Sequence, residues 1–220
     1  ASLIFARIMR PEDFGLYSYF QSVLMIILNI IPFGSGLAVV VFLHSSSDQK
    51  YSRIISNCIF ILMPISALLV FLGLCLFSII SDSPIKPDMA LLLVLNAFFM
   101  AICLTGIHYL LTKQDMRRYS MFFGGYTVIV SIGGVLSYAL FQDVKLLYMI
   151  ILGGLLGLFL ITLNLLKNEC SVNLNYKKKL ITFFWSAKYG LPVVLNSSVM
   201  SFMVIGDRLI LGDVVEMDTL

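Results

Sequence analysis

A lysine, an asparagine and an aspartate form a polar stripe in the C-terminal part of the chain. Asn196 follows Lys188 by eight residues, and Asp207 follows Asn196 by eleven. Both spacings return to about the same side of an α-helix. Because an ionisable side chain inside an apolar segment is costly, Lys188 is a functional candidate. The stripe indicates a helix face that lines a cavity. In the alternative interpretation, Lys188 extends its amine back to the membrane interface.

His108 is the other ionisable residue placed inside an apolar run. Its position near the end of that run leaves two interpretations, a proton or substrate role and an interfacial location. The sequence shows no paired carboxylates, no nucleophile beside a base and no metal-ligand spacing, and its four cysteines form no C-x-x-C pair. We therefore expect no catalytic residue, no metal and no cofactor in this segment.

The composition places these residues in a membrane protein. Of the 220 residues, 60% are hydrophobic and only 12% are charged, against roughly 25% charged in ordinary soluble domains. A soluble fold of this size could not bury so much apolar surface. The small net charge of +3 gives no sign of a nucleic-acid partner. Membrane lipid is the expected surrounding.

Six apolar runs are long enough to cross a bilayer as helices, and short polar stretches separate them. We therefore expect an all-α polytopic membrane protein. The runs cover Phe14–Phe42, Ile54–Ile80, Met89–Leu111, Tyr119–Phe141, Leu146–Leu166 and Leu180–Ile205.

The basic residues predict the orientation of these runs. Nine lysines and arginines lie in the loops after the first, third and fifth runs, and five lie on the opposite side. The positive-inside rule puts the first group in the cytoplasm, so residues 1–13 and 207–220 are expected on the other side. The chain begins within one apolar run and stops shortly after another. We therefore expect a fragment with the end of one span followed by six complete spans.

Prolines and glycines interrupt three of the runs. Proline removes a backbone donor and kinks a helix, so the interruptions predict either curvature for packing or hinges of a moving bundle. The hinge candidates are Pro32, Gly34, Gly36, Pro64 and Pro192.

Other small and polar residues predict contacts between helices. Gly153 and Gly157 form a G-x-x-x-G pattern, which is typical of closely packed membrane helices. Asn29, Asn57 and Asn96 are expected to hydrogen-bond between helices rather than to bind a ligand.

Two segments at the same side of the membrane are weakly alike. Ala6–Tyr17 reads ARIMRPEDFGLY and Asp207–Leu220 reads DRLILGDVVEMDTL. Each has an arginine at a helix end, then apolar residues and a short acidic turn. Six spans separate them, so the repeat predicts a transporter built from two parallel halves.

The same segments carry a resemblance to a known family. Ala6–Phe42, with its P-E-D-F-G-L-Y sequence and glycine-broken span, resembles the first-to-second span region of O-antigen (Wzx-type) polysaccharide flippases. Lys188–Val215, with G-L-P-V-V-L and D-R-L-I-L-G, is similar to the seventh span of that family. The family belongs to the multidrug/oligosaccharidyl-lipid/polysaccharide exporter superfamily.

The resemblance implies a fold and a function. The fold would be 12–14 helices in two bundles around a central cavity, with residues 1–179 supplying spans two to six of the first bundle. Residues 180–220 would be the first span of the second bundle. The protein would flip an undecaprenyl-pyrophosphate-linked oligosaccharide, such as a lipopolysaccharide O-antigen unit, from the cytoplasmic to the periplasmic leaflet of the bacterial inner membrane. No covalent chemistry is implied.

Cations and polar groups would contact the diphosphate and sugars in such a cavity. The substrate-binding candidates are Arg7, Arg10, Lys188, Asn196 and Arg208. Arg7 and Arg208 occupy family motif positions, and His108 and Asp207 are candidates for ion coupling. In the alternative interpretation, Arg7 and Arg208 pair with Glu12 or Asp207 and cap helix ends.

Three other functions are compatible with the sequence. A drug/cation antiporter of the same superfamily would need a carboxylate at mid-membrane, and a glycan polymerase would need a large periplasmic loop. A structural scaffold in a glycan-assembly complex would tolerate leucine substitutions along the cavity face. For a flippase, a polysaccharide polymerase and a chain-length regulator are the expected protein partners.

Overall fold

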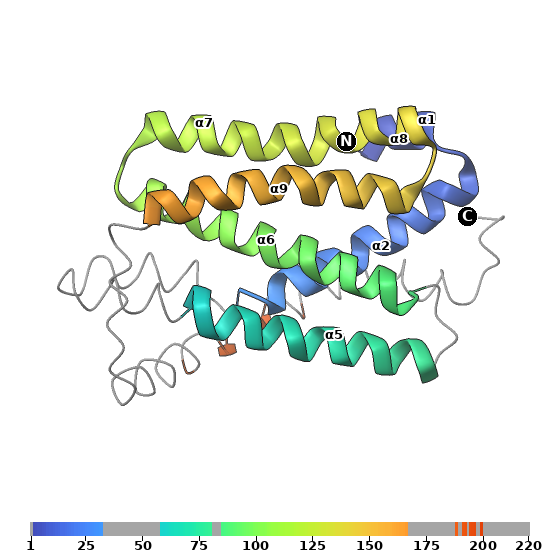
Figure 1. Ribbon diagram of the computed structural model, residues 1–220, viewed down its shortest axis with the longest axis horizontal. Coiled ribbons are helices and arrows are strands. Elements are labelled where there is room, and N and C mark those ends of the chain that lie inside the picture. Colours follow the sequence, from blue (N-terminus) through green and yellow to red (C-terminus); the bar gives the residue numbers. More distant parts are fainter. Residues whose placement is uncertain are drawn as a thin grey trace.

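The computed structural model describes residues 2–32, 58–80 and 85–166, together with seven single positions between 188 and 199. All regular structure in these residues is helical (Figure 1), as the apolar runs predict. The helices are α1 (Ser2–Ile8), α2 (Pro11–Ile30), α5 (Met63–Ile80), α6 (Pro87–Thr112), α7 (Met116–Thr127), α8 (Gly134–Phe141) and α9 (Val144–Leu166), and the π-helical segments are η1 (Cys58–Leu62) and η2 (Val128–Gly133).

Four of the described helices are long and apolar enough to cross a membrane. They match the second to fifth predicted runs, and they cover Ile59–Ile80, Pro87–Thr112, Met116–Phe141 and Val144–Leu165. α2, with 20 residues, is not one of the four. The sixth predicted run, Leu180–Ile205, lies mostly outside the described residues. The described part therefore supports four spans, and the count of six stays a prediction.

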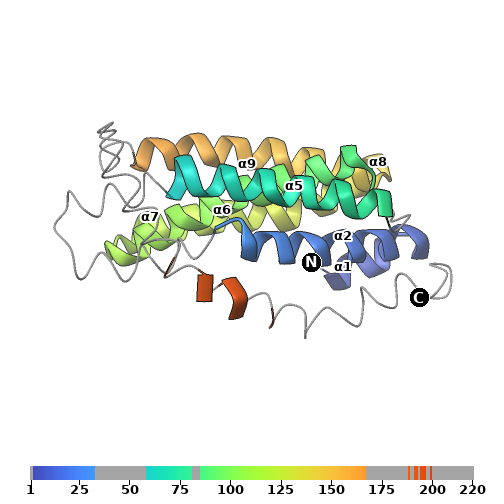
Figure 2. The ribbon, with the colours of Figure 1, turned by 90° about the horizontal axis from the view of Figure 1, so that it is seen from below.

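α6 forms the centre of the bundle. In its most apolar stretch 72% of the residues are buried, against 17% to 33% in the other three spans. It packs against α2, α5, α7 and α9, and Figure 2 shows it between α9 on one side and α2 on the other. Ala90, Ala97, Ala101 and Gly106 lie along it, and such small residues allow neighbouring helices to approach closely.

The outer faces of the bundle are apolar. On α5, Leu68, Leu69, Leu72 and Leu76 are between 50% and 63% exposed. Monomeric soluble proteins rarely expose apolar patches of this kind. These side chains are suited to contact lipid tails, which agrees with a multi-pass membrane protein.

Short turns set the direction of the last three spans. α7 follows α6 after residues 113–115, and α9 follows α8 after residues 142–143. Each turn reverses the chain, so α6 and α9 run in the same direction and the α7–η2–α8 span runs against them. The start of α6, the end of α8 and the start of α9 therefore lie at one end of the bundle (Figure 1).

The first predicted run does not form one helix. α2 ends at Ile30, two residues before Pro32, whose ring cannot supply the next backbone donor. The Ser66 hydroxyl of α5 donates to the Ile31 carbonyl oxygen at 2.8 Å. A neighbouring helix thus satisfies a backbone group at the break, as a membrane interior requires. Gly34 and Gly36 lie outside the described residues.

Candidate functional site

A carboxylate at the start of α2 joins two other parts of the chain. The Tyr138 hydroxyl of α8 donates to Asp13 Oδ2 at 2.6 Å, and Arg10 Nε donates to the same oxygen at 3.1 Å. The hydrogen bond with Tyr138 and the charge of Asp13 raise the pKa of Arg10 above its ordinary value. The guanidinium therefore stays charged, and Asp13 lies at the helix end where a negative charge is favourable.

An aromatic contact beside this cluster attaches α1. The Phe5 ring is 1% exposed, and its centroid lies 4.5 Å from that of Tyr17. A Cβ atom added to Gly134 of α8 would lie 3.3 Å from Phe5 Cζ. The A-R-I-M-R-P-E-D-F-G-L-Y segment thus forms a corner that fixes α1 and α2 against α8. We call this set, comprising Phe5, Arg10, Asp13, Tyr17 and Tyr138, the polar corner.

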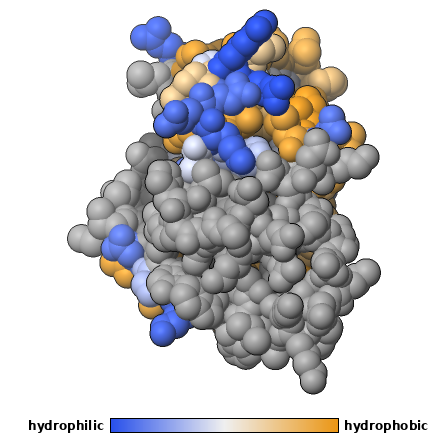
Figure 3. All heavy atoms as spheres, turned by 90° about the vertical axis from the view of Figure 1, so that its left-hand side faces the viewer, coloured by the Kyte–Doolittle hydropathy of each residue, from blue (hydrophilic) through white to orange (hydrophobic). Residues whose placement is uncertain are grey.

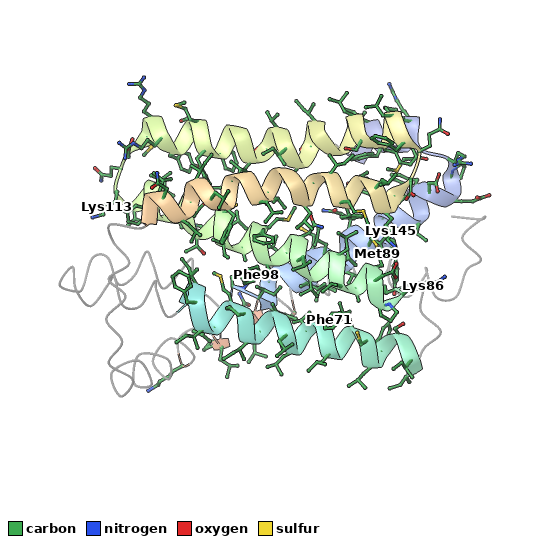
Figure 4. All side chains as sticks on the ribbon, in the orientation of Figure 1. Phe71, Lys86, Met89, Phe98, Lys113 and Lys145 are labelled. Carbon is green, nitrogen blue, oxygen red and sulfur yellow. The ribbon has the colours of Figure 1, made fainter. Side chains whose placement is uncertain are left out.

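An ion pair joins two helix starts at the same end of the bundle. Lys145 Nζ donates to Asp88 Oδ2, which connects the start of α9 to the start of α6. Figure 4 shows Lys145 and Lys86 together at this end. Neither Tyr138 nor Lys145 was identified from the sequence, because no pattern relates either to a partner 125 or 57 residues away.

Deeper in the bundle, an amide links α6 to α9. Asn96 Nδ2 donates to the Leu92 carbonyl at 2.9 Å and to the Tyr148 carbonyl at 3.2 Å, which confirms the predicted interhelical role of Asn96. The Tyr148 hydroxyl makes a long hydrogen bond of 3.4 Å to Gln21 Oε1 of α2. Asn96 Oδ1 is buried and has no partner among the described residues. Asn57 lies outside them.

The substrate-binding candidates are only partly described. Arg7 is exposed in the last turn of α1, and Arg10 is held by Asp13. Lys188 and Asn196 have helical backbone and exposed side chains, whereas Asp207 and Arg208 lie outside the described residues. In the described part, no hydrogen bond or ion pair brings the two N-terminal arginines to Lys188 or Asn196. An ion pair at a helix end, which was the alternative interpretation for Arg7, is observed instead for Arg10, with Asp13 as the partner.

His108 lies one turn before the end of α6. It is half-buried, and its carbonyl oxygen accepts a hydrogen bond from Thr112 Oγ1 at 2.6 Å. Lys113 follows at the end of the helix. This placement agrees with the interfacial interpretation, and a proton role for His108 stays a prediction.

Two further hinge candidates lie in helical backbone. Pro64 is the second residue of α5, two residues after the end of the π-helical segment η1, so the hydrogen bond that proline cannot make falls where the helix is already irregular. Pro192 is helical and exposed. Whether either residue acts as a hinge stays a prediction.

The predicted glycine contact on α9 is wrong for the described part of the chain. A Cβ atom added to Gly153 or Gly157 would meet no atom of another described helix within 4 Å. The close contacts involve other glycines: a Cβ at Gly154 would lie 2.5 Å from Ile129 Cγ2, and one at Gly106 would lie 2.7 Å from Thr162 Cγ2. The pattern marks one face of α9, whereas the packed face lies one residue away.

The two ends of the bundle differ in charge. In the turn after α6 and the first turn of α7, Lys113, Arg117 and Arg118 accompany one carboxylate, Asp115. Figure 3 looks onto this end and shows hydrophilic side chains gathered where α7 begins. At the opposite end, the described cations and carboxylates are equal in number. The cations are Arg7, Arg10, Lys86 and Lys145, and the carboxylates are Glu12, Asp13, Asp88 and Asp143.

Carboxylates in the described helices occur only near their ends. Within the same residues, no group of three His, Cys, Asp or Glu side chains could hold a metal ion. The arrangement described here can fix helices and present charge at two membrane surfaces.

Comparison with known proteins identifies the family. No individual curated protein and no solved structure gave a significant match. Residues 2–220 match the family described as polysaccharide biosynthesis protein, which agrees with the resemblance of Ala6–Phe42 and Lys188–Val215. Because the match covers nearly the whole sequence of this multi-span helical protein, the chain belongs to the polysaccharide biosynthesis protein family.

Proposed function

We propose that this chain is part of a flippase that moves an undecaprenyl-pyrophosphate-linked oligosaccharide from the cytoplasmic to the periplasmic leaflet of the bacterial inner membrane. The family match over residues 2–220 carries this proposal. The described spans support it, since turns of three and two residues join α6 to α7 and α8 to α9. Such turns leave no room there for a domain outside the membrane, which supports handling of the substrate by the membrane-spanning helices.

The charge of the substrate sets the physical problem. Moving a diphosphate out of water is costly unless charged partners replace its hydration, and arginine forms strong paired hydrogen bonds to phosphate. Arg7, Lys188, Asn196 and Arg208 would contact the diphosphate or sugars in a central cavity. Arg10 would act through the polar corner, where Asp13 holds it. Two helix bundles would expose the cavity to each side alternately.

The described carboxylates favour this function over drug/cation exchange. An antiporter for cations would need an acidic side chain at mid-membrane, and the described helices carry theirs near the ends. If an ion gradient biases the two states, His108 and Asp207 are the candidates for coupling. A polysaccharide polymerase and a chain-length regulator would be the protein partners.

The leaflet on which lipid-linked oligosaccharide accumulates tests the proposal. The full-length gene is deleted in its own host, and the lipid-linked oligosaccharide is assayed on each face of the inner membrane. Accumulation on the cytoplasmic face with loss of surface polysaccharide is expected. Periplasmic accumulation of unpolymerised units would instead indicate a polymerase, and normal polysaccharide with new drug sensitivity would indicate an antiporter.

A substitution then tests the cationic candidate. Lys188→Ala in the full-length protein is expected to reduce surface polysaccharide while the protein is inserted normally. Lys86→Ala is the matched control, because Lys86 is also exposed but lies at a helix start beside the Asp88–Lys145 pair. Unchanged polysaccharide with Lys188→Ala would contradict a substrate role for this lysine.

A further inference from the structure

One face of α7 combines a cation with an apolar stripe. Arg117, Met121, Gly124 and Val128 follow one another at intervals of four, three and four residues, so they lie within a sector of about 60° around the helix axis. Met121 is 72% exposed and Val128 is 51% exposed, and Arg117 is exposed as well. A Cβ atom at Gly124 would meet nothing within 4 Å. We call these four residues the α7 stripe.

The length of the α7 stripe matches one leaflet of a bilayer. Eleven residues separate Arg117 from Val128, and at 1.5 Å per residue they span about 16 Å. Half of a hydrocarbon core of about 30 Å is about 15 Å. With Arg117 at the level of the headgroups, Val128 therefore lies near the middle of the membrane, where the π-helical segment η2 begins.

At the start of α7, Asp115 contacts Arg118, and Arg117 is exposed. Asp115 Oδ1 accepts the Arg118 backbone N–H at 3.2 Å, and its other oxygen lies 3.4 Å from Arg118 Nε. Asp115 thus caps α7 and offsets the charge of Arg118. Lys113 lies at the same end of the bundle (Figure 4). The first turn of α7 carries two cations, Arg117 and Arg118, against the one carboxylate of Asp115, which complements an anionic headgroup.

We propose that the α7 stripe binds one anionic phospholipid of the surrounding bilayer, with the phosphate on Arg117 and an acyl chain along Met121, Gly124 and Val128. The exposed position of the stripe and its length of one leaflet favour a bilayer phospholipid over the longer polyprenyl carrier of the proposed substrate. The inference needs only a membrane-embedded chain and does not depend on the proposed transport. The orientation expected from the basic loops places this lipid in the cytoplasmic leaflet.

Lipid retention by the full-length protein tests this site. The protein is extracted from vesicles of equal parts phosphatidylglycerol and phosphatidylcholine, and the lipids that remain bound are counted by native mass spectrometry. The wild-type protein is expected to retain phosphatidylglycerol preferentially. Arg117→Gln is expected to lower that retention about fivefold, which corresponds to one basic residue near an anionic surface. Arg117→Lys keeps the charge and is expected to stay within about twofold of wild type.

The control is Lys86→Gln, which removes the same charge at the opposite end of the bundle, and which is expected to leave retention unchanged. Equal losses in Lys86→Gln and Arg117→Gln would overturn the proposal, because they would indicate a nonspecific effect of net charge. Unchanged retention in Arg117→Gln would overturn it as well. Added undecaprenyl pyrophosphate identifies the source of the phosphate: if it displaces phosphatidylglycerol from Arg117, the bilayer lipid is not the ligand. A result that overturns the lipid site does not affect the transport proposal, because the leaflet assay tests transport independently.

Discussion

Gly106 of the central helix α6 lies close against Thr162 of α9. In Gly106→Ala the new Cβ atom would lie 2.7 Å from Thr162 Cγ2, whereas carbon atoms in contact lie about 3.5–4.0 Å apart. The helices would have to separate by about 1 Å, or Thr162 would have to rotate. Rotation would break the hydrogen bond of 2.9 Å from Thr162 Oγ1 to the Leu158 carbonyl oxygen.

Two opposing effects set the magnitude. Overpacking a well-packed core costs about 1–3 kcal/mol, while alanine stabilises a helix interior over glycine by up to about 1 kcal/mol. With the full alanine gain, we therefore expect Gly106→Ala to lower the free energy of unfolding by up to about 2 kcal/mol. Gly157→Ala is the matched control, because its Cβ would meet nothing within 4 Å, and it is expected to be neutral or slightly stabilising.

A second substitution locates the clash. Thr162→Ser removes Cγ2 and keeps the hydroxyl, after which the atom nearest to the new Cβ would be Oγ1 at 3.5 Å. The double variant Gly106→Ala/Thr162→Ser is expected to recover about 1–2 kcal/mol relative to the sum of the single changes. The assay is unfolding of the purified full-length protein by increasing SDS mole fraction, followed by circular dichroism. If Gly106→Ala and Gly157→Ala unfold at the same point, the packing described for α6 and α9 is wrong.

Three further predictions concern hydrogen bonds, and each is measured by the same unfolding assay. Tyr138→Phe keeps the ring and removes the hydrogen bond to Asp13, so it is expected to cost about 1–2 kcal/mol; wild-type stability would contradict the polar corner. Ser66→Ala removes the donor to the Ile31 carbonyl and is expected to cost about 1 kcal/mol, and a loss below about 0.3 kcal/mol would show that water or another group replaces it. Asn96→Leu removes a buried oxygen without a partner together with the two hydrogen bonds that Nδ2 donates to the Leu92 and Tyr148 carbonyls. Because these effects oppose each other, the change is expected to cost no more than about 2 kcal/mol, and a loss above about 4 kcal/mol would contradict the absence of a partner for Oδ1.

Hydropathy was sufficient to locate most of the described fold. The second to fifth apolar runs agree with the observed spans within a few residues at each end, because membrane-spanning helices need a minimum length of apolar sequence. Pro32 also predicted a break, since a proline cannot continue the backbone hydrogen bonds of a helix. Both predictions depend only on local sequence.

Contacts between distant helices could not be predicted in the same way. The spacing of Gly153 and Gly157 identifies a face of α9, but it does not say on which side of α9 the neighbouring helix lies. Tyr138 and Asp13 meet across 125 residues, and no periodicity relates them. The sequence marked Arg10 as a cationic candidate for substrate binding, whereas its pairing with Asp13 depends on the geometry of the first turn of α2. The sequence locates the membrane-spanning segments, whereas the contacts between helices depend on how the helices pack.

The central position of α6 has a consequence for the biosynthesis of the protein. Residue Leu166 at the end of α9 is synthesised 54 residues after Thr112 at the end of α6, which at about 5–20 residues per second takes roughly 3–11 seconds. During this interval α6 is in the membrane without its main partner. Its buried polar side chains have partners within the helix itself, since Asn96 donates to the Leu92 carbonyl and Thr105 to the Ala101 carbonyl. α6 can therefore enter the bilayer alone, and the bond from Asn96 to α9 is added when the later helix arrives.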